Sequence, residues 1–205
     1  CRCAPTAKSL TYNGGEQALV DAGTATGGEM RYKLDTGSDT AWSDTIPKAT
    51  NAGDYTVSYI VKGDDQHSNS EVGSVKVTIA PKPVTITGIT VTSKEYDGTT
   101  TANITGTPKI EGLVEGDGVA LIGPGTATFD TPDAGTDKKV TISGYTLMGN
   151  GSAEDNYTLT QPTGIKGTIT PATLTIESVK VAAKTYNGKT DATVESVSLS
   201  GIKLS

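Results

Sequence analysis

The sequence predicts an all-β protein made of tandem repeats. Thr and Gly are abundant while Leu, Met and Phe are sparse, a balance typical of β-branched strands joined by glycine-containing turns. Apolar and polar residues alternate with the two-residue period of half-buried strands, and stretches with a helical period are missing. One motif occurs three times along the 205 residues, at spacings of 84 and 90 residues. A nearly constant period of this kind indicates repeated structural units.

The repeat is clearest in the second half of the chain. Residues 84–102 recur as residues 174–192, at an offset of 90 residues without a gap. A looser copy at residues 7–18 precedes the second copy by 84 residues. The tripeptides at the centre of the three copies are Tyr12-Asn13-Gly14, Tyr96-Asp97-Gly98 and Tyr186-Asn187-Gly188.

The ends of the repeats are marked by proline. Pro81 and Pro171 each follow a strand-like segment that closes a repeat. We therefore predict one all-β module at residues 1–81, a second at 82–171 and a partial third at 172–205. The connection between the first and second modules contains two prolines within a few residues, which favours an extended and stiff backbone there.

Each full module is predicted to be a small β-sandwich. Short strands separated by turn residues favour an immunoglobulin-like sandwich. A β-grasp-like module is the alternative; it needs one helix, and only residues 16–20 could supply a helical turn. The alternations that predict strands are Val75/Val77/Ile79, Val140/Ile142 and Tyr157/Leu159.

The motif Tyr-Asx-Gly, with its flanks, resembles the YDG and MBG repeats of bacterial surface proteins and adhesins. The segment 82–171 is similar to the YDG type through residues 94–100 and 155–157, and 6–81 resembles an MBG-like module. The partial repeat at 172–205 is similar to the first third of a YDG repeat. This resemblance implies an extracellular, multi-copy, non-catalytic role as a structural stalk or adhesin segment. A carbohydrate- or host-protein-binding module is the alternative.

The Asx-Gly pairs are predicted to form tight turns. Asp97-Gly98 and Asn187-Gly188 are the dipeptides expected where a turn demands positive φ. We expect Tyr96 and Tyr186 to pack their rings on an adjoining strand, which makes the motif structural rather than ligand-binding.

One segment resembles the catalytic loop of aspartic proteases. Residues 35–38 read Asp-Thr-Gly-Ser, but this chemistry requires two carboxylates that share a proton, and a second Asp-Thr/Ser-Gly is missing from the chain. A single copy is compatible with a protease that pairs two subunits. The flanking residues nevertheless continue the strand pattern, so we interpret the segment as a turn.

No catalytic, cofactor or metal site is predicted. His67 is the only histidine and lies in a polar loop without partners for a catalytic relay or a zinc site. Carboxylate-rich loops at residues 64–65, 115–117 and 154–156 lack the ligand order of an EF-hand.

Trp42 and Tyr32 are the candidate ligand-binding residues. Together with other tyrosines of the first module they could form an aromatic platform for glycans. A sandwich normally buries its lone tryptophan, so we favour a core position for Trp42.

Composition excludes several partners, and the resemblance to YDG and MBG repeats implies a location. The net charge of −6 is dispersed, so neither nucleic acid nor insertion into a membrane is predicted. Cys1 and Cys3 are too close for an unstrained disulfide. We expect an extracellular or cell-surface location, with any export signal or anchor outside these residues. The open strand edges of residues 172–205 are predicted to dock on the second module or on a neighbouring molecule.

Overall fold

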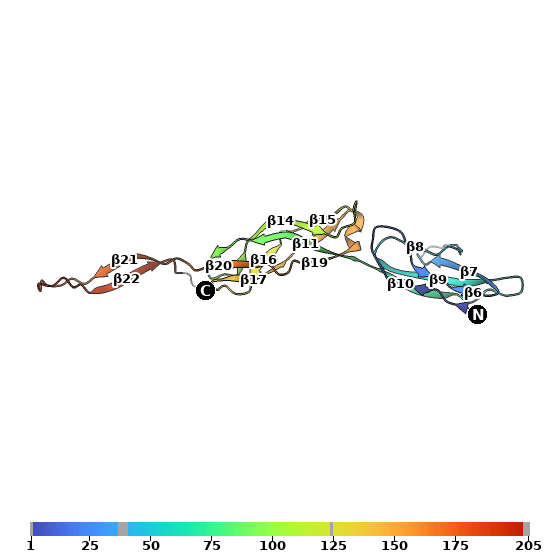
Figure 1. The fold of residues 1–205 in the computed structure, drawn as a ribbon, viewed down its shortest axis with the longest axis horizontal. Helices are drawn as coiled ribbons and strands as arrows, with labels where there is room; N and C mark the ends of the chain where they lie inside the picture. Colours follow the sequence, from blue (N-terminus) through green and yellow to red (C-terminus); the bar gives the residue numbers. More distant parts are fainter. Residues whose placement is uncertain (1, 37–40, 124, 203–205) are drawn as a thin grey trace. The chain divides into compact units, whose positions relative to one another are not determined.

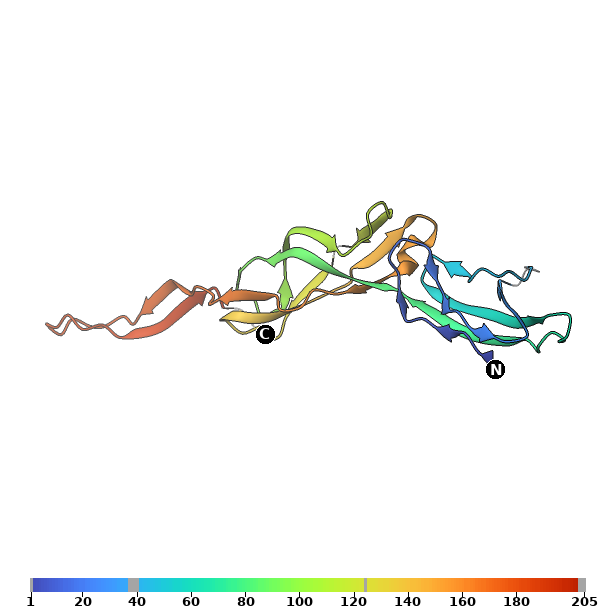
Figure 2. The same ribbon diagram turned by 45° about the vertical axis from the view of Figure 1, so that its right-hand side comes forward.

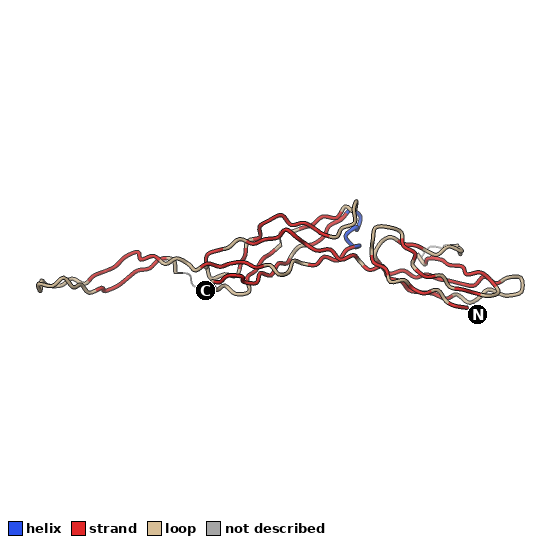
Figure 3. Tube along the Cα trace, in the orientation of Figure 1, coloured by secondary structure: helices blue, strands red, loops and turns tan. Residues whose placement is uncertain are grey.

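The fold is mostly β-structure, as the sequence predicts. The computed structural model describes residues 2–36, 41–123 and 125–202. Strands make up 54% of the chain and form several separate sheets, and a short 3₁₀ helix, η1 (Asn150–Asn156), accompanies them (Figures 1 and 3). The all-β class is therefore confirmed, whereas the immunoglobulin-like sandwich stays a prediction.

The first repeat is built around one four-stranded sheet. Its long strands are β7 (Gly28–Leu34), β9 (Gly53–Gly63) and β10 (Gly73–Ala80), which pair antiparallel. The short strand β3 (Leu10–Thr11) pairs parallel with β10. Three antiparallel pairs of short strands complete the repeat: β1 (Arg2–Cys3) with β6 (Thr24–Ala25), β2 (Thr6–Ala7) with β5 (Val20–Asp21), and β4 (Gln17–Ala18) with β8 (Lys48–Ala49).

The segment that could have supplied a helical turn forms strands instead. β4 and β5 occupy most of residues 16–20; Leu19 between them and Val20, the first residue of β5, are fully buried. The backbone here bonds to distant segments instead of forming a helical turn: the Leu19 N–H donates to the Pro47 carbonyl, and β5 pairs with β2.

The second repeat contains a three-stranded and a five-stranded sheet. The first has the order β14 (Ile104–Glu111), β11 (Lys82–Val91), β19 (Tyr157–Thr160). The second has the order β12 (Lys94–Glu95), β20 (Lys166–Thr170), β17 (Gly135–Ser143), β16 (Thr126–Phe129), β13 (Thr101–Ala102). β15 (Val119–Ile122) pairs with β18 (Thr146–Gly149).

Both repeats share one topological device. The strand that precedes the Tyr-Asx-Gly motif pairs parallel with the last strand of the repeat: β3 with β10, and β12 with β20. The backbone N–H of the motif tyrosine extends each pair, donating from Tyr12 to the Ala80 carbonyl at 2.9 Å and from Tyr96 to the Thr170 carbonyl at 2.8 Å. The tyrosine is thereby held beside the point where the chain leaves the repeat. Only Pro81 separates β10 from β11, so the backbone is extended here as expected, whereas the stiffness of this connection stays a prediction.

Packing divides the chain into two compact units. One contains residues 1–86, 109–122 and 146–160, and the other contains residues 87–108, 123–145 and 161–205. These units differ from the repeats read from the sequence, and the module boundaries at 81 and 171 stay predictions. Alternating strand residues fill both interiors as expected; Val77, Ile79, Val140 and Ile142 are at most 3% exposed.

Residues 172–202 contain a two-stranded hairpin. Its strands, β21 (Thr175–Val181) and β22 (Val194–Ser200), pair antiparallel, and among the residues that the structure describes no other strand joins their sheet (Figure 2). Both strands are exposed on both faces over nearly all their length. They pair with each other rather than with the second module, and contact with another molecule stays a prediction.

Candidate functional site

The candidate site surrounds Tyr12, within the first compact unit. The ring of Tyr12 is 5% exposed and packs edge-on against the ring of Tyr157, with the centroids 5.4 Å apart and the planes at 79°. Tyr12 comes from the first sequence repeat and Tyr157 from β19 of the second. The two repeats are therefore joined by a buried aromatic pair.

A single carboxylate ties the two tyrosines together. Oδ2 of Asp117 accepts a hydrogen bond from the Tyr12 hydroxyl at 2.7 Å and another from the Tyr157 hydroxyl at 2.5 Å. The Tyr157 oxygen in turn accepts from the backbone N–H of Val114 at 3.0 Å. Hydrogen bonds to a charged acceptor are stronger than neutral ones, so this network favours one arrangement of the three side chains.

The electrostatics of the network follow from the shared carboxylate. Hydroxyl donation by Tyr157 and Tyr12 lowers the pKa of Asp117 below its ordinary value. The hydrogen bond to Asp117, aided by burial, raises the pKa of Tyr12 to about 12. Burial, and then Asp117, also raise the pKa of Tyr157. Each shift favours a charged Asp117 with two neutral phenols, the protonation state in which both bonds form.

A second set of contacts lies beside the carboxylate network. The side-chain oxygen of Asn156 accepts from the backbone N–H of Ala52 at 2.7 Å, and its amide nitrogen donates to the Asn51 side-chain oxygen at 3.4 Å. Asn156 is 6% exposed and directly precedes β19. Ala52 therefore contributes a backbone donor from the first repeat to an amide of the second.

The contacts of Tyr12, Ala52 and Asn51 with Asp117, Tyr157 and Asn156 are called the first repeat joint below. Gly14 allows the backbone of the first repeat to approach the second closely in this joint. Its φ is +82°, and a Cβ added there would lie 2.5 Å from Cγ1 of Val114. Gly14 thus meets two requirements of the Tyr-Asn-Gly turn: a left-handed backbone and space for a side chain of the second repeat.

The Asx residue of each motif locks the turn that carries the tyrosine. A side-chain oxygen of Asn13, Asp97 and Asn187 accepts from the backbone N–H two residues later, at 2.9, 2.9 and 3.0 Å. Gly98 and Gly188 have φ of +78° and +75°, the conformation expected for these turns.

A lysine reinforces the turn in the second copy. Nζ of Lys94 donates to the Asp97 carboxylate at 2.7 Å and to the Thr99 carbonyl at 2.9 Å. The Lys94 hydrogen bond is the main reason why the pKa of Asp97 falls to about 2. Lys184 makes the matching contacts to Asn187 and to the Lys189 carbonyl in the third copy.

The motif tyrosines have different surroundings in the three copies. Tyr12 is buried, Tyr96 is half-buried and Tyr186 is 92% exposed. The expectation that Tyr186 packs on an adjoining strand is therefore wrong. In the described part of the chain, no strand pairs with the residues before Tyr186 as β10 does with β3 and β20 with β12.

The two candidate ligand-binding residues lie in different environments. Tyr32 is 3% exposed, and its hydroxyl accepts from the Gly23 N–H at 3.0 Å, so its ring belongs to the core. Trp42 is only half-buried, which contradicts the expected core position. Tyr32 and Tyr59 are instead among the aromatic side chains that fill this interior. The Trp42 ring has Nζ of Lys33 at 5.3 Å from its centroid.

The protease-like segment falls partly outside the described residues, because 37–40 are not among them. Asp35 itself accepts a hydrogen bond from the Ser58 hydroxyl at 2.7 Å, and its N–H donates to the Thr56 carbonyl at 2.9 Å. These contacts attach Asp35 to strand β9.

The polar loops show local contacts. His67 is exposed, with Nδ1 2.5 Å from the Asp64 carboxylate. No group of three or more His, Cys, Asp or Glu side chains among residues 2–36, 41–123 and 125–202 is arranged to hold a metal ion. No helix in this part of the chain is long and apolar enough to cross a membrane.

Two residues of the first repeat joint lie in loops whose composition suggests a different role. Asp117 and Asn156 lie in the acidic loops 115–117 and 154–156, which attract attention as oxygen-rich cation ligands. Their role is instead to accept hydrogen bonds from Tyr12 and Ala52. The repeat signal marked Tyr12, but nothing in the spacing of the motifs links it to residues 105 positions away.

The region that supplies the second half of this joint also matches a known family. Residues 80–164 match the YDG domain. The chain contains a YDG domain. This match covers β11 to β19 and includes Tyr96, Asp117 and Tyr157. The searches of curated proteins and of solved structures returned no match.

Proposed function

We propose that this chain is a non-catalytic segment of a bacterial surface protein, outside the cell, in which a YDG domain and its neighbouring repeat form a stalk. The observation that carries the proposal is the shared carboxylate: Asp117 of the YDG domain accepts hydroxyls from Tyr12 of the preceding repeat and from Tyr157 of its own. A flexible tether between independent domains does not require hydrogen bonds between side chains of the two domains. A stalk requires them, because successive repeats must keep a constant orientation to hold a distance.

The one-residue connection supports the same function. β10 ends at Ala80 and β11 begins at Lys82, with Pro81 between them. Proline fixes its own φ and offers no backbone donor, so it limits bending at this position. The connection and the joint therefore restrain the repeats at two separate points.

Rotational diffusion tests the stalk. Backbone ¹⁵N relaxation of the full chain is expected to give one common tumbling tensor for residues 10–80 and for the YDG residues of the same compact unit. In Asp117→Asn the two sets are expected to separate, whereas Asp191→Asn, in an exposed loop of the third copy, leaves the tensor unchanged. Independent tumbling in the unaltered protein would remove the basis for a stalk.

Cell-surface exposure is tested separately. An antibody against the chain is expected to label intact cells of the source bacterium as strongly as permeabilised ones. Labelling only after permeabilisation would contradict the extracellular part of the proposal.

Glycan binding at Trp42 is a second candidate function. Trp42 lines a hollow of about 350 Å³ together with Arg31, Ile60, Lys62 and Asn69. An aromatic ring beside amide and cationic donors is a suitable surface for a sugar, because the ring stacks on C–H groups while the donors bond to hydroxyls. On a glycan array, a signal lost in Trp42→Ala but kept in Tyr186→Ala would support this function; equal binding by both variants would refute it.

A further inference from the structure

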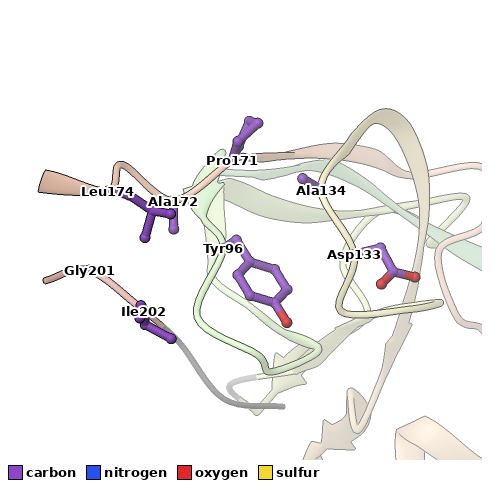
Figure 4. A pocket seen from close by; sticks show the side chains of 8 residues that line it. All are labelled: Tyr96, Asp133, Ala134, Pro171, Ala172, Leu174, Gly201 and Ile202. Atoms are coloured by element: carbon purple, nitrogen blue, oxygen red, sulfur yellow. The ribbon is translucent and has the colours of Figure 1, made fainter. Parts of the chain in front are cut away.

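A pocket in the second compact unit surrounds the tyrosine of the second motif copy. It has a volume of about 420 Å³. Figure 4 shows the Tyr96 ring between the loop that carries Asp133 and Ala134 and the base of the C-terminal hairpin, with Leu174 and Ile202. Its residues are Tyr96, Asp133, Ala134, Pro171, Ala172, Leu174, Gly201 and Ile202.

These residues correspond to the residues of the first repeat that contact Asp117, Tyr157 and Asn156 in the first repeat joint. Tyr96 is the counterpart of Tyr12, and both donate their backbone N–H to the last strand of their repeat. The run Asp133-Ala134-Gly135 matches Asn51-Ala52-Gly53. Pro171 matches Pro81. The pocket therefore reproduces, in the second repeat, the contact residues that the first repeat contributes to the first repeat joint.

The hairpin segment that begins at Leu174 corresponds to strand β11, which leads from the first repeat into the second. Leu174 lies 90 residues after Val84, and the glycines that face these two positions also correspond. Gly112 (φ +99°) faces Val84, and Gly201 (φ +87°) faces Leu174, each with its potential Cβ nearest to a backbone carbonyl of the opposite strand. Ile202 then matches Leu113, which packs with Val84 and Tyr12 in the first unit.

The burial of the apolar side chains differs between the first repeat joint and the Tyr96 pocket. Val84 is 1% exposed, because it packs in a cluster with Val114, Val119, Leu147, Tyr157 and Leu159. Its counterpart Leu174 is 55% exposed, and Ile176 and Val179 of β21 are 65% and 50% exposed. The corresponding positions Ile86 and Ile89 of β11 are both 7% exposed.

Two polar groups at the pocket also lack the partners that their counterparts have. In the first joint the Tyr12 hydroxyl bonds to Asp117 and the Ala52 N–H bonds to Asn156. Among the described residues, no hydrogen bond is formed by the Tyr96 hydroxyl or by the N–H of Ala134. Asp133 replaces Asn51, and its carboxylate is a stronger acceptor for a side-chain amide.

We propose that the Tyr96 pocket and the hairpin β21–β22 form the acceptor half of a second repeat joint, and that its occupant is the remainder of a YDG module folded onto this hairpin. The occupant contributes a carboxylate to the Tyr96 hydroxyl, an asparagine to Ala134 and Asp133, and an apolar strand face to Leu174 and Ile176. The inference extends the proposed stalk by naming where the next repeat binds and which side chains it must carry.

Two extended proteins test the proposal. In the first, Ile202 is followed by a second copy of residues 114–171, which completes a module on the existing hairpin. In the second, Pro171 is followed by a second copy of residues 82–171, whose added module contains its own hairpin. Amide hydrogen exchange at Ala134 is expected to slow by about tenfold or more in both, relative to the 205-residue chain, because an opened hydrogen bond is required for exchange.

Asparagine variants show whether the expected bond is responsible. Replacing the added copy of Asn156 by Ala should return the Ala134 rate to that of the 205-residue chain and leave Ala52 protected. The change Asn156→Ala at the original position should do the reverse. An unchanged Ala134 rate in the second protein overturns the proposal, whether or not the added residues of the first protein fold. Protection in the second protein alone overturns the role given to β21–β22.

The same spectra separate this inference from the proposed stalk. Ala52 reports on the first joint and Ala134 on the second. Protection of Ala52 without protection of Ala134 refutes the second joint alone. Rapid exchange at both sites would refute the stalk itself.

Discussion

The hydroxyl of Tyr12 is the most direct test of the joint. Tyr12→Phe removes one hydrogen bond to the Asp117 carboxylate and keeps the ring, which packs at 5.4 Å from Tyr157. A bond to a charged partner contributes about 1.5–3 kcal/mol to stability. Asp117 is only half-buried and keeps its bond from Tyr157, so we expect a loss near the lower limit, about 1.5 kcal/mol.

Urea unfolding followed by the fluorescence of Trp42, the only tryptophan, measures the loss in the repeat that contains Tyr12. Tyr186→Phe is the matched control, because this side chain has the same place in the motif but is 92% exposed. We expect the control to change the free energy of unfolding by less than about 0.5 kcal/mol.

A double-mutant cycle assigns the loss to the bond itself. Asp117→Asn is expected to destabilise the protein, and adding Tyr12→Phe to it should cost clearly less than Tyr12→Phe costs alone. Equal effects of Tyr12→Phe and Tyr186→Phe, or strict additivity with Asp117→Asn, would refute the view that this carboxylate holds the repeats together.

Three further outcomes are expected. In urea unfolding, Gly14→Ala should lower the free energy of unfolding by about 1–3 kcal/mol more than Gly188→Ala does. Both variants change a residue with positive φ, but only Gly14 faces a side chain of another repeat. Equal losses would contradict the close approach of Gly14 to Val114. The lowered pKa of Asp117 contributes stability that is lost as the pH falls below about 4, and the raised pKa of Tyr12 contributes stability that is lost as the pH rises from about 10 to 12. The joint should therefore be most stable between these limits; urea unfolding followed by Trp42 fluorescence at a series of pH values would contradict this if the free energy of unfolding showed no such plateau. Trp42 should be quenched more by iodide than by caesium, because the cation of Lys33 lies beside its ring; equal quenching would place this lysine elsewhere in solution.

The sequence alone predicts the strand-rich class, the extended joint at Pro81 and the turns of the three motifs. These features depend on short-range rules: alternation along strands, the fixed φ of proline and the left-handed preference of Asx-Gly. The YDG resemblance was predicted from the same motif and its fixed offset, and the match at residues 80–164 confirms it.

The joint could not be predicted, because its contacts cross more than 100 residues of sequence. Asp117 and Asn156 have no local pattern that distinguishes them from the exposed acidic residues around them. Trp42 was placed in the core on a general packing preference, but Tyr32 and Tyr59 occupy that interior. The role of a tyrosine in this repeat therefore depends on which segment covers it, and the motif alone does not specify that segment.

The parallel pairing between the strand that precedes the Tyr-Asx-Gly motif and the last strand of each repeat determines how a pulling force would act on this protein. A load applied between β3 and β10, or between β12 and β20, pulls on two strands that run in the same direction. Because each pair is parallel, the load slides one strand along its neighbour and strains all bonds of the pair together. Antiparallel hairpins pulled from their open ends separate one bond at a time and yield at lower force. The four parallel pairs between residues 82–85 of β11 and 157–160 of β19 add a second clamp of the same geometry, so the region around the Tyr12 joint is where we expect resistance to extension to be greatest.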